Sequence, residues 1–346
     1  MMLIINNKPI IILSNMTARI SIALATYNGE KYIAEQLQSF CTQTKLPDEL
    51  IVCDDCSQDK TLTILCNFAK NAPFFVKVIE NQKNLGWAQN FSKAISLCTG
   101  DIIFISDQDD VWLTSKIEKI IYYFSSNPEV QLLIHDIEYC KDDLTPIGQT
   151  KIERMEEIFD IQHDFVVGMA TAIQRPFLQY CLPVPKETNI GHDKWLHQCA
   201  TAIGKKKVVK DVLALYRRHN SNVMSDNRFN VGQVTTSAYL KRTPLEKIQR
   251  ILNKKEELNN LLRDPLIPWL LNNRNILINK NYTTEKEIDY FIKKKLTLIE
   301  DIEERYNILV LSRWKRLIPI YKFYIKGGYV NYDGWMSAIS DIFSFK

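Results

Sequence analysis

The sequence has no apolar run long enough to cross a bilayer. The stretch Ile10–Leu13 is too short for a membrane span or for the apolar core of a secretory signal, and no other run approaches about 18 apolar residues. We therefore expect a protein that does not span the membrane. Residues 1–17 read as an N-terminal extension in which translation starts at either Met1 or Met16.

The sequence also lacks a strong charge of either sign. Its 346 residues carry a formal net charge of +4, so bulk charge gives no reason to expect a nucleic-acid partner. With 46% hydrophobic and 24% charged residues, the composition is that of an ordinary globular protein. The length suits one α/β domain of about 230 residues with a smaller addition.

No glycine-rich phosphate loop is present. The chain has no GxGxxG after its first predicted strand and no GxxxxGK[ST] motif. This absence disfavours dinucleotide-dependent oxidoreductases and P-loop enzymes. Any diphosphate ligand must be held in another way, and a metal ion is the simplest alternative.

A second cysteine pair is missing as well. Cys53 and Cys56 form a CxxC, but two acidic residues separate them and no matching pair follows at zinc-ligand spacing. Several of the eight cysteines lie in apolar runs, where a thiol behaves as a small buried hydrophobe. We interpret them as reduced and structural, which indicates the cytosol.

Strand and helix patterns alternate through the first half of the chain. Short apolar runs predict strands at 20–25, 50–53, 74–79, 102–105 and 130–134, and helical periodicity predicts helices at 31–43, 60–70, 87–97 and 115–124. This alternation predicts βαβ units and a mostly parallel sheet flanked by helices. Ligands bind beyond the carboxyl ends of the strands in such sheets, so the polar clusters that follow three of them are expected to meet.

The later part is less regular. Residues 140–161 are polar and poorly periodic, 165–173 are small and apolar, and a helix at 191–203 precedes a strand at 208–216. Beyond about residue 230 the patterns are helical. Capping boxes begin at Thr243 and at Thr284, and the second opens a helix predicted to reach Tyr306. The expected domains are therefore an extension (1–17), a catalytic domain (18–230) and a helical C-terminal region (231–346).

Aspartates crowd the end of two predicted strands. Asp107, Asp109 and Asp110 would repel one another unless a cation compensates, and a hard divalent ion with oxygen ligands is the natural partner. The alternative is that Asp110 only caps the following helix. Asp54 and Asp55, after the second strand, can accept hydrogen bonds from a nucleobase or ribose.

Two further polar residues are weaker candidates by themselves. Asp193 stands beside an aromatic residue and suits general-base work, or it caps the helix that it opens. His219 follows a strand and is either a metal ligand or a plain histidine. The neighbouring Arg218 can bind phosphate by charge-assisted hydrogen bonds.

Together these motifs resemble family 2 glycosyltransferases, which have the GT-A fold, over about Ala18–Asn222. The matching segments are 25–29, 54–59, Asn84-Leu85-Gly86 with Asn90, 106–112, 192–195 and 216–220. The resemblance implies an α/β protein of the GT-A fold, with a mostly parallel nucleotide-binding sheet flanked by helices and a helical C-terminal extension. The family usually has glycine where this chain has Cys56.

The resemblance also implies roles for single residues. Asp193 would be the catalytic base of an inverting displacement, and Asp109 with His219 would hold a divalent metal ion, Mn²⁺ or Mg²⁺. Asp107 would lie nearer the ribose. The expected nucleotide-sugar contacts are Thr26, Tyr27, Asn28, Glu30, Asp54, Asp55, Asn90, Asp107, Gln108 and Arg218.

Within the family, the DQDDVW, HD-aromatic and YRxH motifs resemble bacterial rhamnosyltransferases that build O-antigen, capsule or cell-wall polysaccharide. A dTDP- or UDP-sugar donor and a glycan acceptor, free or lipid-linked, follow from that resemblance. Two other functions stay open. They are a sugar-phosphate nucleotidyltransferase, which would want a glycine- and arginine-rich loop after the first strand, and a non-catalytic nucleotide- or glycan-binding module.

The C-terminal region mixes basic and aromatic residues. Arg313-Trp314-Lys315-Arg316 leads into an apolar stretch with Lys322, Lys326, Tyr321 and Tyr324. This mixture suits the surface of a bilayer, here the cytoplasmic face of the inner membrane. It suits equally well a helical subdomain packed on the catalytic core, with its lysines reaching water.

Overall fold

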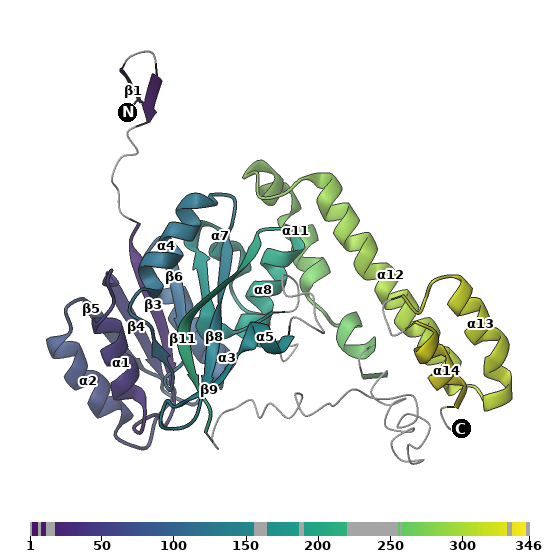
Figure 1. The fold of residues 1–346 in the computed structure, drawn as a ribbon, viewed down its shortest axis with the longest axis horizontal. Helices are drawn as coiled ribbons and strands as arrows, with labels where there is room; N and C mark the ends of the chain where they lie inside the picture. The colour runs from purple at the N-terminus through teal and green to yellow at the C-terminus, as the bar shows by residue number, and fades with distance from the viewer. Residues whose placement is uncertain are drawn as a thin grey trace. The chain divides into compact units, whose positions relative to one another are not determined.

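The computed structural model describes residues 2–5, 8–11, 18–155, 165–186, 190–219, 255–256, 258–330 and 334–343. The chain divides into two compact units, Met1–Asn220 and Ser221–Lys346 (Figure 1). The boundary predicted near residue 230 lies outside the described residues. In the first unit, β1 (Met2–Ile5) and β2 (Lys8–Ile11) pair with each other as an antiparallel hairpin.

Four parallel strands form one half of the main sheet. They lie in the order β5 (Phe75–Glu80), β4 (Glu49–Asp54), β3 (Ile20–Thr26) and β6 (Ile102–Ser106). Every residue of β3, β4 and β6 is buried, which suits continuous apolar runs in a sheet covered on both faces. The strands predicted at 20–25, 50–53, 74–79 and 102–105 are confirmed.

The other half of the sheet is mixed. β10 (Thr171–Gln174) runs antiparallel between β6 and β8 (Leu132–Cys140), and β11 (Lys206–Arg217) runs parallel to β8. β7 (Val111–Trp112) and β9 (Pro146–Thr150) add short antiparallel pairings to β11 and β8. The predicted α/β class with a mostly parallel sheet is therefore confirmed.

Helices flank the sheet (Figure 1). α1 (Ile33–Cys41) and α2 (Thr61–Asn71) contact each other, whereas α3 (Trp87–Leu97) packs on β3 and β4 and touches α8 (His192–Ala202), which packs on β8 and β11. Ile33, Leu37 and Phe40 of α1 are buried at helical spacing, as an amphipathic helix requires. α4 (Lys116–Ser126) completes the helices predicted in this unit.

Some elements were not predicted. Within the poorly periodic residues 140–161, β9 and α5 (Lys151–Met155) form, and α7 (Arg175–Cys181) and the short β7 were also not predicted. β9 is exposed along most of its length, so it shows no apolar alternation, and β8 continues through polar residues to Cys140. β7 and β9 are stabilised by pairing with a neighbouring strand, and the sequence does not reveal this pairing.

The second unit is helical in its described part, as expected. Its main elements are α11 (Leu266–Asn279), α12 (Glu285–Val310), the 3-10 turn η3 (Arg313–Arg316), α13 (Leu317–Ile325) and α14 (Trp335–Phe343). The capping box at Thr284 is confirmed: the Glu287 N–H donates to Thr284 Oγ1 at 3.3 Å, and the Thr284 N–H donates to Glu287 Oε2 at 2.8 Å. The one predicted at Thr243 lies outside the described residues.

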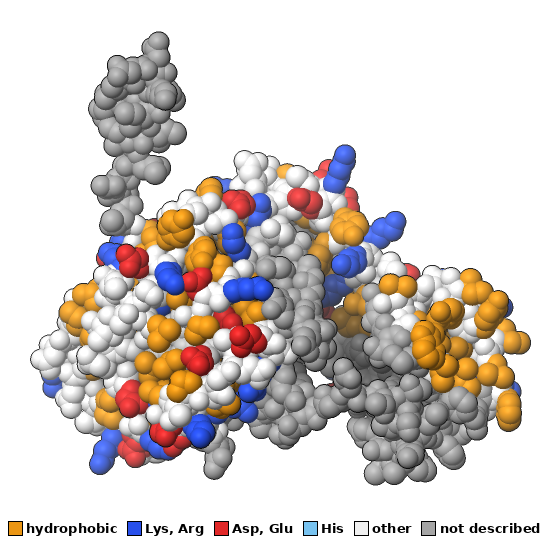
Figure 2. Space-filling view, in the orientation of Figure 1, with side chains coloured by type: hydrophobic (Ala, Val, Ile, Leu, Met, Phe, Trp, Pro, Cys, Tyr) orange, Lys and Arg blue, Asp and Glu red, His pale blue; other side chains and the backbone are white. Residues whose placement is uncertain are grey.

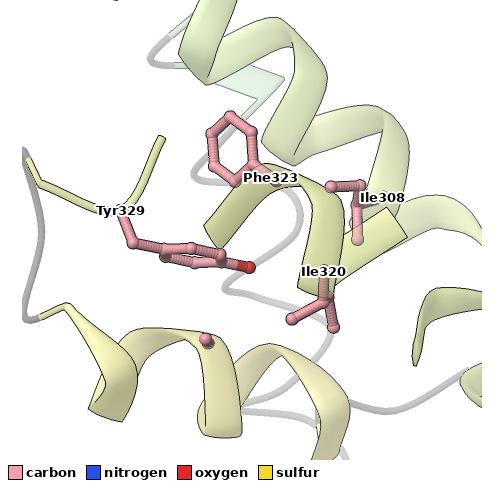
Figure 3. Close-up of a cluster of buried hydrophobic side chains, with 5 residues drawn as sticks. Ile308, Ile320, Phe323 and Tyr329 are labelled. Carbon is pink, nitrogen blue, oxygen red and sulfur yellow. The ribbon is translucent and has the colours of Figure 1, made fainter. Parts of the chain in front are cut away.

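A small apolar core and a buried ion pair hold the end of this unit together. Ile308, Ile320, Phe323 and Tyr329 pack against one another (Figure 3). The guanidinium of Arg305 donates two hydrogen bonds, of 2.8 and 3.2 Å, to the carboxylate of Asp341, which is fully buried. Among the helices described, none is both long enough and apolar enough to cross a membrane.

We expect Thr284→Ala to lower the stability of this unit by about 1 kcal/mol, because it removes the cap of α12. Thr284→Ser keeps a hydroxyl oxygen at the same place and is the matched control. Amide hydrogen exchange over the first turn of α12 measures the effect directly. Equal protection in the alanine and serine variants would contradict the assignment.

Candidate active site

Three polar loops meet at one edge of the sheet, as expected. They follow β3, β4 and β6, and the strand order changes direction between β3 and β6, where ligands bind in open α/β sheets. The Tyr27 N–H donates to Gln108 Oε1 at 2.9 Å, and Gln108 Nε2 donates to the Tyr27 carbonyl at 3.0 Å. This pair joins the first loop to the third.

Hydrogen bonds also join the first loop to the second. The Asn28 N–H donates to Ser57 Oγ at 2.9 Å, and Asn28 Oδ1 accepts from the Gln58 N–H at 2.8 Å. Glu30 Oε2 accepts from the Lys60 N–H at 2.9 Å. Asn28 and Glu30, expected at the nucleotide, therefore brace the loops in this structure, whereas the Tyr27 side chain is 49% exposed.

Asp54 and Asp55 are buried at the end of β4. Asp54 accepts hydrogen bonds from Thr26 Oγ1 at 2.8 Å and from Ser57, and Asp55 accepts from Asn81 Nδ2 at 2.7 Å. Asp55 also accepts from the N–H groups of Leu85 and Gly86. Each carboxylate thus satisfies backbone and side-chain donors of the surrounding loops.

Asn90 belongs to the same buried network. Its Oδ1 accepts from Asn81 Nδ2 at 2.9 Å, and its Nδ2 donates to the Cys53 carbonyl at 2.8 Å. Thr26, Asp54, Asp55 and Asn90 were all expected to contact the nucleotide sugar. The structure brings them together at the predicted edge and shows them bonded to the protein itself.

Cys56 holds the backbone conformation that glycine favours. Its φ of +65° lies in the left-handed region, where a side chain costs about 1–2 kcal/mol. The thiol donates to the Asn81 carbonyl at 3.0 Å. Cys56 therefore adopts the left-handed conformation that a glycine would adopt without this cost. All eight cysteines are free.

The turn after β6 concentrates negative charge. Burial, the Asp109 charge and the Asp193 charge raise the pKa of Asp107 to about 8, and burial with the same neighbouring acids raises the pKa of Asp110 well above its usual value. Asp110 Oδ1 accepts from the Arg217 N–H at 3.1 Å, so Asp110 does not cap α4. Among described residues, its buried Oδ2 has no hydrogen-bond partner.

Lys116 is the buried cation of this region. It is completely buried, donates to the Met169 carbonyl at 2.7 Å and lies over the Trp112 ring at 3.7 Å. Burial lowers its pKa, and the charges of Asp110 and Asp107 oppose that shift. Sequence reasoning missed this lysine because it stands at the start of a helix, where a lysine is ordinarily solvated.

Asp109 and His219 are adjacent, as the resemblance implied. His219 Nε2 lies 2.8 Å from Asp109 Oδ2, and its ring stacks on Tyr32 with centroids 4.6 Å apart. Asp109 lies in the turn after β6, and His219 follows β11. The mixed half of the sheet therefore brings together two residues that are distant in sequence.

Arg217, which sequence reasoning did not single out, is built into the site. It is buried, its Nε donates to the Asp109 carbonyl at 2.8 Å, and its other guanidinium nitrogens donate to Glu35 and to the Asp142 carbonyl. The Arg218 guanidinium lies 5.9 Å from the Tyr139 ring centroid. Arg217 is the last residue of β11, and Arg218 follows it.

Asp193 lies in the first turn of α8, next to the acidic turn. Its charge contributes to raising the pKa of Asp107, so the two carboxylates are within electrostatic reach. A Cβ at Gly191 would stand 2.6 Å from Asp193 Oδ1 and 2.4 Å from the Trp87 ring, so glycine is needed for this close approach. The Trp87 side chain, 46% exposed, is therefore a site residue that sequence reasoning missed.

His192, beside Asp193, is buried between aromatic rings. It stacks on Phe91 with centroids 4.0 Å apart and meets Trp87 edge-on at 5.7 Å. Burial lowers its pKa to about 4, although the Asp193 charge opposes that shift. The residue next to the proposed base is therefore neutral at physiological pH.

The residues present fit a divalent cation. Among described residues, no group of three or more His, Cys, Asp or Glu side chains forms a complete cage. Asp109 and His219 nevertheless offer one carboxylate and one imidazole, beside Asp110, whose pKa is raised although Lys116 lies close to it. An ion that also takes phosphate oxygens and water needs only one or two protein ligands.

Comparison with known proteins finds a family match over part of the first unit. The sequence model of the family described as Glycosyl transferase family 2 matches residues 21–180. An uncharacterized glycosyltransferase of Nostoc is 27% identical over 213 residues, which are 59% of this chain and 66% of that protein. A dTDP-rhamnosyl transferase of Shigella flexneri is 37% identical over 102 residues, 28% of this chain and 35% of that protein.

The chain thus spans less than two thirds of the length of these curated relatives. Among solved structures, S. aureus TarS in complex with UDP-GlcNAc is 18% identical with a TM-score of 0.49, and covers 92% of this chain and 90% of its own.

Acid is expected to destabilise the first unit through its buried histidine. The folded-state pKa of His192, about 4, lies below the unfolded value near 6.5, so its contribution is complete above pH 6.5 and is lost as pH falls below it. Between pH 7.5 and pH 5 the loss is about 2 kcal/mol. Urea unfolding at the two values should show a smaller pH dependence in His192→Phe. An unchanged pH dependence would contradict a buried neutral imidazole.

Proposed function

From the match of residues 21–180 to glycosyl transferase family 2, whose members are inverting enzymes, we propose the activity of the whole chain. The protein transfers a sugar from a nucleoside diphosphate donor to a hydroxyl group of a glycan acceptor. The observation that carries this proposal is the meeting of Asp107, Asp109, His219 and Asp193 beyond the carboxyl edge of the sheet.

Asp193 is the base in this proposal. It lies in the first turn of α8, where the helix dipole favours a negative charge, and the neutral His192 adds no competing positive charge. Its carboxylate accepts the proton of the acceptor hydroxyl as the hydroxyl oxygen attacks the anomeric carbon of the donor. The bond to the diphosphate breaks on the opposite face, which inverts the anomeric centre.

Asp109 and His219 would hold the divalent cation, Mn²⁺ or Mg²⁺. When bound, the ion supplies positive charge to the diphosphate that leaves. Arg217 fixes the carbonyl of Asp109 from one side, and Tyr32 stacks on the His219 ring from another. The chain's own contribution is therefore to keep the two ligands in one geometry before the donor arrives.

The exposed side chains at the carboxyl edge of the sheet suit contact with the nucleoside and sugar of the donor and with the acceptor sugar. Tyr27 offers a half-exposed ring between the loops after β3 and β6, and Gln108 fixes its backbone. Trp87 offers a second ring next to Asp193, and an aromatic face is a surface on which a sugar ring can pack. The buried Asp54, Asp55 and Asn90 act by shaping the loops that carry these residues.

The donor that we propose is a dTDP- or UDP-sugar, with rhamnose favoured. The similarity to the Shigella flexneri dTDP-rhamnosyl transferase supports rhamnose over 102 residues. The acceptor is a glycan of a cell-surface polysaccharide such as O-antigen or capsule, carried on a lipid. This places the reaction in the cytoplasm, at the inner face of the membrane.

Asp193→Asn is expected to lower donor turnover by at least about a hundredfold, because the amide cannot accept the proton. Release of UDP or dTDP from UDP- and dTDP-sugars in the presence of Mn²⁺ measures turnover, with water as acceptor. Binding of UDP or dTDP, measured by calorimetry, should be retained.

Asp143→Asn is the matched control and should turn over normally, because this exposed carboxylate accepts a hydrogen bond from the Thr145 N–H at 3.0 Å. Near-normal release in Asp193→Asn would remove the base from the proposal. Release absent in the unaltered chain with every donor would leave only a binding module.

Asp109→Asn and His219→Gln are each expected to weaken Mn²⁺-dependent binding of UDP or dTDP by at least about tenfold, because each removes one of two protein ligands. EDTA should weaken binding to the unaltered chain to a similar extent. Calorimetry with and without Mn²⁺ measures both. Binding that is equally tight in the variants and insensitive to EDTA would show that the pair holds no cation.

A further inference from the structure

The second unit carries an apolar face that its own core does not use. Ile320 and Phe323 of α13 point into the core with Ile308 and Tyr329 (Figure 3). Five other aliphatic or aromatic residues of α13 are exposed: Leu317 at 42%, Ile318 at 68%, Tyr321 at 65%, Tyr324 at 46% and Ile325 at 65%. We call these five residues the α13 face. Hydrophobic side chains gather there in Figure 2.

Tryptophans extend this surface at both ends. Trp314, in η3 directly before α13, is 80% exposed, and Trp335, at the start of α14, is 56% exposed. Contacts between α13 and both η3 and α14 keep the three segments in one body. Exposed apolar surface of this extent marks an interaction site in a soluble domain.

The segment that carries the α13 face is basic, although its Lys326 pairs with Glu304 of α12 at 2.8 Å. Residues 313–330 include five basic residues and no acidic residue. Lys315 and Lys322 are exposed within this segment. Tryptophan, tyrosine and branched aliphatic side chains next to lysines form the composition that binds at the headgroup boundary of a bilayer.

We propose that the α13 face docks the protein on an anionic lipid surface. The aromatic and aliphatic side chains enter the headgroup boundary, and the lysines meet the lipid phosphates. A second copy of the chain is a less suitable partner. A two-fold contact would place Lys315 and Lys322 of both copies in the protein–protein interface, where lysine is disfavoured.

The buried ion pair between Arg305 and Asp341 gives this face a fixed shape. Tyr329, whose ring belongs to the core behind α13, donates its hydroxyl to Asp341 at 2.9 Å, and Arg316 donates to the Asp341 carbonyl at 3.2 Å. The side chains behind the face are thus held in place, so changes on its outer side need not unfold it. Docking stands whether or not the proposed transferase activity is correct.

Co-sedimentation of the full chain with vesicles tests the proposal. Binding should be stronger to mixed phosphatidylglycerol and phosphatidylcholine than to phosphatidylcholine alone, and should fall as salt rises. The variant Ile318→Ser/Tyr321→Ser/Ile325→Ser should bind at least about tenfold more weakly, because it removes three apolar side chains that would enter the membrane. Lys315→Glu/Lys322→Glu should lose the preference for phosphatidylglycerol.

The matched control replaces three equally exposed apolar residues elsewhere on the unit. Leu271→Ser/Tyr290→Ser/Leu296→Ser changes α11 and α12 at residues that are 52%, 71% and 47% exposed, and should bind as the unaltered chain does. Circular dichroism confirms that each variant is folded. No binding by the unaltered chain, or equal loss in the control, overturns the proposal. So does a concentration-dependent dimer in light scattering that only the α13-face variant abolishes.

Discussion

Negative charge that the protein does not fully offset is the constraint on which the rest of the site depends. Asp107, Asp109 and Asp110 share one turn, and Lys116 is the buried cation beside them. Burying carboxylates without compensation is costly, so the pKa values of Asp107 and Asp110 rise. The divalent cation that we propose would offset this negative charge and so favour the ionised form of the turn.

The carboxylates of the site therefore fall into two groups. Asp54 and Asp55 have their acceptor capacity filled by Thr26, Ser57, Asn81 and backbone N–H groups. Asp54 and Asp55 stabilise the loops, and hydrogen-bond donors compensate their negative charge. In the turn after β6, Asp110 accepts from the Arg217 N–H, and its Oδ2 has no hydrogen-bond partner among the described residues.

The sequence could predict the first half of the fold because each signal there is local. Continuous apolar runs in β3, β4 and β6 and helical spacing in α1 and α3 depend on burial by immediate neighbours. β7, β9 and the inward turn of Arg217 depend on pairing with strands distant in sequence, which no local pattern records. For the same reason Asp109 and His219, 110 residues apart, could be joined only through a family resemblance.

Arg217 shows why such distant contacts matter for chemistry. One guanidinium reaches the Asp109 carbonyl, the Glu35 carboxylate and the Asp142 carbonyl, and its own backbone N–H bonds Asp110. Arg217 thereby connects the acidic turn to α1, to the loop after β8 and to β11, which His219 follows. A lysine could satisfy the charge but not these directions at once, since its ammonium is a single compact centre. The geometry of the site is therefore set before any ligand binds. The conformational entropy of ordering these side chains is lost during folding and not on binding.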